Sequence, residues 1–87
     1  MNSAAYLMAK NGGDLDSALK LANYVHLMDN KNPAYKDTLG YIYMKKGDLK
    51  KAEDLFFEAY RDIPFNKELQ EHIMELKELK MKSTFKR

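Results

Sequence analysis

Residues 35–66 decide the fold, and they read YKDTLGYIYMKKGDLKKAEDLFFEAYRDIPFN. Two helical patterns lie in this stretch, and they are joined at residues 47–48. Each pattern carries small residues at positions that can face large residues on the other. The small ones are Gly40 and Ala52, and the large ones are Tyr43 and Phe56. Because two helices approach closely only where a small side chain leaves room for a large one, the stretch predicts a closely packed helical pair.

The residues that set this spacing follow a fixed order. They are Leu39, Gly40, Tyr43, Ala52, Phe56, Ala59 and Pro64. The order Leu-Gly-x-x-Tyr, then Ala-x-x-x-Phe, then Pro resembles the tetratricopeptide repeat, a helix-turn-helix unit of about 34 residues. Lys36 stands where that family usually has a Trp. The resemblance implies an all-α fold in which antiparallel helix pairs stack into a short right-handed α-solenoid.

A second copy of the pattern lies one repeat length earlier in the chain. Six identical residues recur at that offset: Gly13, Asp14, Leu15, Ala18, Leu21 and Asn32 stand opposite Gly47, Asp48, Leu49, Ala52, Leu55 and Asn66. Other positions differ, since the same offset places Tyr6 opposite Gly40 and Ala22 opposite Phe56. The sequence therefore predicts two repeats, of which the first departs from the family pattern.

The repeats define one domain over residues 1–82. We expect an incomplete first repeat over about 1–32, a full repeat over about 33–66, a capping helix over about 67–81, and a frayed basic tail over 83–87. The five expected helices are Asn2–Asn11, Leu15 to about Asp29, Pro33–Lys46, Leu49 to about Asp62, and Lys67 to about Met81. A helix that begins so close to Met1 suggests a piece of a longer array.

Residues that start and stop helices support these bounds. The expected N-caps are Asp14, Asn32, Asp48 and Asn66, whose side chains can accept a hydrogen bond from a first-turn N–H group. Pro33 suits the first helical position, because its missing N–H would be unpaired there anyway. The glycines at 12–13 and 47 are expected to end helices, and Pro64 disfavours helical geometry at Ile63.

Composition sets limits on the class of protein. A chain of 87 residues with 45% hydrophobic and 32% charged residues can form one small, well-solvated domain. It has no cysteine for a disulfide or a thiolate metal site, which leaves the compartment open. No apolar run is long enough to span a membrane, and Met1 is not followed by a signal-type segment. The net charge of +2 is too small to indicate nucleic-acid binding by itself.

The sequence contains no recognisable catalytic motif. His26 and His72 lack carboxylates at a metal-ligand spacing, and each is interpreted as an ordinary helix residue. None of the serines neighbours a histidine that could activate it. We therefore expect no enzyme activity, no small-molecule substrate, no cofactor and no metal.

The candidate site is a surface. In tetratricopeptide arrays the first helix of each pair lines a concave face that binds a peptide of a partner protein, and the resemblance carries this role to one set of residues. They are Ser3, Leu7 and Lys10, then Asp37, Tyr41, Met44 and Lys45, and finally Glu68, Glu71, Glu75 and Glu78. Such a groove would have an apolar centre and an acidic wall, and it would suit a partner with Lys or Arg beside apolar anchors.

Simpler interpretations of the same residues remain open. The four glutamates could be a solvated helix face, and Tyr41 and Met44 could pack against a neighbouring helix. The subfamily that grips a partner's C-terminal carboxylates uses cationic and amide side chains on these helices. Asp37 and Glu71 stand here instead, so that function is not expected.

Two other functions are weighed against peptide binding. A homodimer could form through exposed end helices, with Met74 and Met81 as a contact patch. Nucleic-acid binding would use two lysine-rich clusters. Lysines near helix C-termini are also expected simply because they interact favourably with the helix dipole. Nucleic-acid binding is therefore the weakest of the three functions. The clusters are Lys45, Lys46, Lys50 and Lys51, and Lys77, Lys80, Lys82, Lys86 and Arg87.

Overall fold

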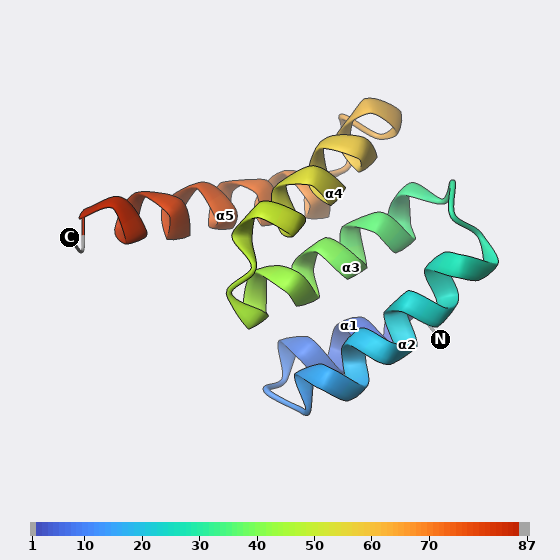
Figure 1. Cartoon of the computed structure of the whole chain (residues 1–87). Helices are drawn as coiled ribbons and strands as arrows, with labels where there is room; N and C mark the ends of the chain where they lie inside the picture. Colours follow the sequence, from blue (N-terminus) through green and yellow to red (C-terminus); the bar gives the residue numbers. More distant parts are fainter. Residues whose placement is uncertain (1, 86–87) are drawn as a thin grey trace.

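Helix α3 (Pro33–Lys46) lies at the centre of the molecule and contacts each of the other four helices (Figure 1). This computed structural model describes residues 2–85, and the side chains of residues 5–82. The other elements are α1 (Asn2–Lys10), α2 (Leu15–Met28), α4 (Leu49–Asp62) and α5 (Lys67–Phe85). Residues 2–85 contain no strand, so the expected all-α class is confirmed. The radius of gyration of 12.3 Å matches the ~12 Å of one folded domain of this length.

The four expected N-caps all form. Asp14 Oδ1 accepts from the N–H groups of Asp16 at 3.0 Å and Ser17 at 3.4 Å. Three further hydrogen bonds complete the set: Ala34 N to Asn32 Oδ1 at 2.9 Å, Lys51 N to Asp48 Oδ1 at 3.2 Å, and Leu69 N to Asn66 Oδ1 at 2.9 Å. These caps satisfy N–H groups that the helix itself leaves unpaired. The chain is thereby divided where the sequence predicted.

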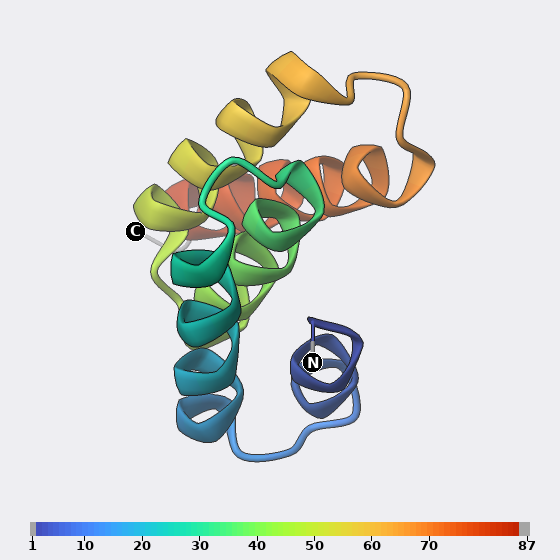
Figure 2. The same cartoon turned by 90° about the vertical axis from the view of Figure 1, so that its right-hand side faces the viewer.

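The glycine turns show that the first helix is shifted by one position from the regular repeat. Gly47 has a φ of 91°, and the next N–H, that of Asp48, donates to Tyr43 O at 2.9 Å. In the first turn it is Gly12 that has a positive φ, of 75°, and Gly13 N–H donates to Met8 O at 2.8 Å. The N–H of Asp48 bonds to the end of α3, and the side chain of Asp48 caps α4. In the first turn, Gly13 makes the backbone bond to the end of α1, and Asp14 caps α2. Counted from the positive-φ glycine to the N-cap of the next helix, the first turn therefore has one residue more than the second. Figure 2 shows the first turn between α1 and α2.

This extra residue corrects the expected pairing of Tyr6 with Gly40. With the longer offset, Ala5 corresponds to Gly40, and Tyr6 corresponds to Tyr41. Ala5 is completely buried, as a small residue at a close helix contact should be. The first helix thus has a small residue at the expected place, and the assumption of a constant offset hid it.

Helices α3 and α4 approach each other closely at Gly40. A Cβ atom built on Gly40 would lie 2.8 Å from Phe56 Cε1 and 2.9 Å from Phe56 Cδ1. Phe56 is itself fully buried in the core, which also contains Ile42, Ala52 and Leu69. The spacing of Gly40 and Phe56 in the sequence therefore predicted a real contact.

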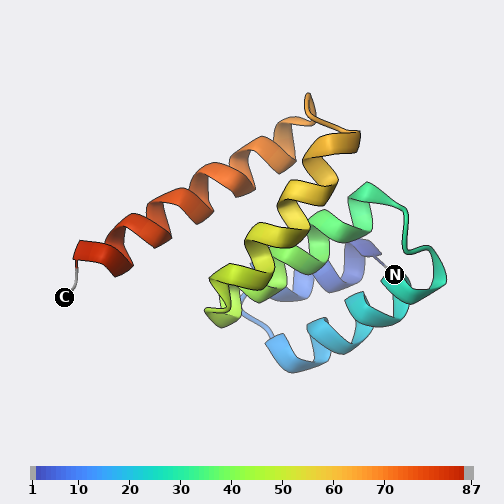
Figure 3. The same ribbon diagram turned by 45° about the horizontal axis from the view of Figure 1, so that its top comes forward.

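Helix α5 differs from its expected length. It continues past Met81 to Phe85, and its C-terminal part extends beyond the other four helices (Figure 3). The expected frayed tail over 83–87 is therefore helical as far as Phe85, and Lys86 and Arg87 lie outside the described residues. The sequence between Met81 and Phe85 contains no glycine or proline that would stop a helix.

Candidate functional site

Three polar side chains from three helices meet in the interior. His72 on α5 lies between Asp37 on α3 and Tyr6 on α1. His72 Nδ1 is 2.7 Å from Asp37 Oδ1, and Tyr6 Oη is 3.2 Å from His72 Nε2. Asp37 and His72 are each only 5% exposed. This cluster is the only place where α1 and α5 are joined by a hydrogen bond among the described side chains.

The chemistry of the three groups fixes where the hydrogens lie. A carboxylate can only accept, so the hydrogen on the imidazole is assigned to Nδ1, which donates to Asp37. In the neutral ring Nε2 then has a free lone pair and accepts from the Tyr6 hydroxyl. The buried Asp37 and His72 and the half-buried Tyr6 hydroxyl therefore each have a partner, as buried polar groups require.

Aromatic rings enclose the cluster. The Tyr41 ring lies 4.6 Å from the His72 ring and 4.9 Å from the Tyr6 ring, measured between centroids. Burial raises the pKa of Tyr6 to about 12, and the nearby carboxylates of Glu68, Asp37 and Glu71 contribute in the same direction. Tyr6 therefore stays protonated and acts as a donor at neutral pH.

The order carboxylate, imidazole, hydroxyl is also the order of a catalytic triad. Activation of a hydroxyl needs an accessible group whose proton is easily removed. Here the raised pKa of Tyr6 opposes removal of the proton, and Asp37 and His72 are closed off from solvent. The geometry is suited to holding α1, α3 and α5 together.

Three of the residues expected to line a groove lie inside the molecule. Asp37, Tyr41 and Met44 are buried, so they are not available to a partner in this structure. Tyr6 and His72 close over α3 from both sides, which fills the expected apolar centre. Of the two interpretations left open for Tyr41 and Met44, the structure places both residues in the core.

The remaining expected residues lie at the surface around this cluster. Leu7, Lys10, Glu68, Glu71 and Glu78 are exposed. The Lys10 Nζ lies 5.7 Å from the centroid of the Tyr6 ring. The Ser3 side chain lies outside the described side chains.

Lys45 and Glu75 form an ion pair across α3 and α5. Lys45 Nζ donates to Glu75 Oε2 at 2.9 Å, and this hydrogen bond raises the pKa of Lys45. Glu68, Glu71 and Glu78 have no such partner among the side chains of residues 5–82. The acidic row on α5 therefore keeps three unpaired carboxylates.

No family model, no curated protein and no solved structure matches the chain significantly. Within residues 2–85, no helix is long and apolar enough to cross a membrane, and no three metal-ligating side chains form a group. The functional argument therefore depends on the geometry of the chain itself.

Three lysines of the middle cluster, and Lys80 of the C-terminal cluster, pair with carboxylates. Lys46 pairs with Asp16, Lys50 with Asp54 at 3.3 Å, and Lys80 with Glu53 at 2.6 Å. The Lys51 Nζ lies 5.1 Å from the centroid of the Tyr43 ring. These contacts partly neutralise both clusters.

The sequence did not predict the Asp37–His72–Tyr6 cluster. From the sequence, His72 was interpreted as an ordinary helix residue. A signal did exist: once the extra residue of the first turn is counted, Tyr6 and Tyr41 are equivalent residues of successive first helices and should lie side by side. Finding it would have required knowing that the first turn carries that residue.

Proposed function

We propose that this protein is a noncatalytic protein-binding module built from tetratricopeptide-like repeats. The contacts between helices support the repeat assignment. Helix α3 packs against α4 and also against α1 and α5, which begin the neighbouring pairs, whereas no contact joins α2 to α4. In the tetratricopeptide family, the first helices of successive pairs likewise line one face.

The repeated caps also support this assignment. Asn32 and Asn66 cap α3 and α5 and lie one repeat length apart, and Asp14 and Asp48 cap α2 and α4 at the same distance in the sequence. Equivalent helices thus start with the same chemistry.

The observation that carries the binding proposal is the unpaired acidic row on α5. Glu68, Glu71 and Glu78 are exposed on α5. Glu68 and Glu71 are close enough to Tyr6 to contribute to its raised pKa. Because Tyr41 and Met44 are buried, recognition here is mainly electrostatic, with the exposed Leu7 as an apolar contact. The partner is an extended segment rich in Lys or Arg.

Two competing functions have less support. A nucleic-acid surface needs unpaired cations, and the lysines of the middle cluster are engaged by Glu75, Asp16, Asp54 and the Tyr43 ring. An enzyme would have to use the buried cluster of Asp37, His72 and Tyr6, whose tyrosine keeps its proton.

A matched pair of peptides tests the proposal. One short peptide carries two leucines flanked by lysines, and its twin carries glutamates in place of the lysines. Calorimetry should detect binding of the lysine peptide alone, and amide chemical shifts should map it to α1, α3 and α5. The double variant Glu68→Gln/Glu71→Gln should weaken binding about tenfold, since each lost ion pair contributes up to about 1 kcal/mol.

The control removes the same charge from another face. Asp54→Asn/Asp62→Asn on α4 lowers the net negative charge equally and should change the affinity less than about twofold. Equal binding of both peptides, or equal weakening by both double variants, would contradict recognition by the acidic row.

A further inference from the structure

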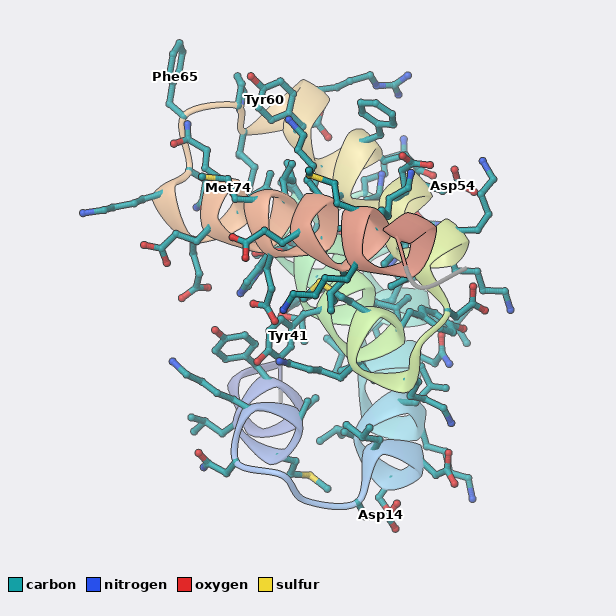
Figure 4. All side chains as sticks on the ribbon, turned by 90° about the vertical axis from the view of Figure 1, so that its left-hand side faces the viewer. Asp14, Tyr41, Asp54, Tyr60, Phe65 and Met74 are labelled. Carbon is teal, nitrogen blue, oxygen red and sulfur yellow. The ribbon has the colours of Figure 1, made fainter. Side chains whose placement is uncertain are left out.

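A groove of about 560 Å³ lies between α4 and α5. Its apolar lining consists of Phe56, Phe57, Tyr60, Ile73, Met74 and Leu76. Phe57 is 65% exposed and Met74 is 63% exposed, so large apolar side chains are left in contact with solvent. Tyr60 and Met74 lie on the opposite side of α5 from Tyr41 (Figure 4). The groove is therefore separate from the acidic face, by which we mean the side of α5 that carries Glu68, Glu71 and Glu78.

The same positions occur one repeat length earlier, where a helix covers them. Gly40 is in contact with the Phe56 ring of α4, and the Tyr43 ring lies below Lys51 of α4. Their counterparts on α5 are Met74 and Lys77, and both are exposed. Helix α5 thus presents the face that α3 uses to bind α4, but none of the described helices covers it.

The packing of α4 on α3 indicates which kind of helix could cover the matching face of α5. An amphipathic helix fits, because α4 packs on α3 in that form, with Ala52, Phe56 and Ala59 buried at spacings of four and three. Gly40 leaves room on α3 for the Phe56 ring, whereas the equivalent position on α5 carries the larger Met74 side chain. The docked helix therefore needs a small residue opposite Met74.

The charges beside the α4–α5 groove indicate which kind of helix would bind there. Lys80 on the rim pairs with Glu53, but Lys77 pairs with no carboxylate among the described side chains. A second copy placed symmetrically on this groove would bring the same cation to both sides of the contact, which is unfavourable. In a helix that packs on α5 as α4 packs on α3, an acidic residue at the position equivalent to Lys51 would pair with Lys77 instead.

We propose that the α4–α5 groove binds an amphipathic helix of another protein, with a small residue against Met74 and an acidic residue facing Lys77. This second interface is independent of the acidic face, takes a partner of opposite charge, and extends the protein's role to joining two partners.

Two helical peptides test this proposal on the full chain. Both carry residues 48–64 of this sequence with Phe56→Ala, and both are cross-linked on their solvent face to hold the helix. One keeps Lys51 and the other has Lys51→Glu. We expect the Lys51→Glu peptide to bind at least about fivefold more tightly to the wild type, and the order to reverse on the Lys77→Glu protein. Amide shifts should lie on α4 and α5.

Two protein variants localise the effect. Met74→Glu should abolish binding, whereas Leu27→Glu on α2 makes the same kind of change at an exposed site and should leave it intact. Both residues are exposed, so both variants should keep the wild-type circular dichroism. No binding of the Lys51→Glu peptide up to about 1 mM would overturn the proposal, as would shifts on α1 and α3 or no reversal by Lys77→Glu. Light scattering that shows dimers broken by Met74→Glu would overturn it too, in favour of a second copy. Failure of the lysine peptide described above would leave this result unaffected.

Discussion

At the scale of single residues, Gly40 sets how closely α3 and α4 approach. Gly40→Ala places a Cβ atom 2.8 Å from a Phe56 ring that is fully buried and cannot move aside. Overpacking of this kind costs about 1–3 kcal/mol, and the better helix propensity of alanine returns up to about 1 kcal/mol. We expect a net loss of about 1–2 kcal/mol in the free energy of unfolding, measured by urea denaturation.

The double variant Gly40→Ala/Phe56→Leu is the matched control. Leucine is smaller than phenylalanine, so adding alanine at position 40 should cost less in that background than in the wild type. An equal cost in both backgrounds, or a gain in stability from Gly40→Ala alone, would contradict the contact.

At the scale of the helix, Asp14 starts α2. The hydroxyl of Ser17 and the N–H groups of Ser17 and Asp16 donate to its carboxylate and lower the pKa of Asp14. A carboxylate whose pKa is lowered in the folded state stabilises it above the unfolded pKa of 3.8, and this contribution disappears as the pH falls. Asp14→Ala should lower Tm by roughly 4 °C at pH 7, and the difference should shrink below about pH 4.

Thermal unfolding followed by circular dichroism between pH 2 and pH 7 measures this difference. Asp54→Ala on α4 is the control, because Asp54 is an exposed carboxylate in the middle of a helix. A gap between Asp14→Ala and the wild type that stays constant down to pH 2 would exclude the carboxylate as its source.

The helices show how far sequence reasoning reaches. Caps and helix breakers are local, so Asn32, Pro33 and Gly47 predicted the bounds of α3 as they are observed. The register of α1 against α3 was wrong, because it depends on which glycine of a pair takes the positive φ. The backbone of Gly12 adopts it and that of Gly13 does not.

At the scale of the whole molecule, the row of glutamates on α5 could be predicted from the sequence, but the burial of Tyr41 and Met44 could not. The spacing of the glutamates places them on one face of α5 wherever that helix lies. Whether Tyr41 faces solvent depends instead on how closely α1 and α5 pack around it. The contacts of Tyr6 with Tyr41 and His72 hold these helices in place. Such contacts join residues up to 66 positions apart, beyond the reach of local patterns.

Tyr6 therefore links the first and last helices, and its titration reports on the entire fold. Its pKa is about 12 in the folded protein and 10.0 in the reference state. A raised pKa means that the folded state holds the proton longer, so the stabilisation is complete below about pH 10 and is lost as the pH rises towards 12. Tyr6→Phe should cost about 0.5–1.5 kcal/mol at pH 7 through the lost hydrogen bond to His72.

The gap between Tyr6→Phe and the wild type should then close above pH 10, because only the wild type loses stability by ionising this group. Urea denaturation at several pH values from 7 to 11 measures the gap, and absorbance at alkaline pH shows whether one late-titrating tyrosine disappears in the variant. Tyr24→Phe removes an exposed tyrosine from α2 and should change neither result. If Tyr6→Phe kept the late titration, or if its stability gap stayed constant to pH 11, Tyr6 would not be the group that joins α1 to α5.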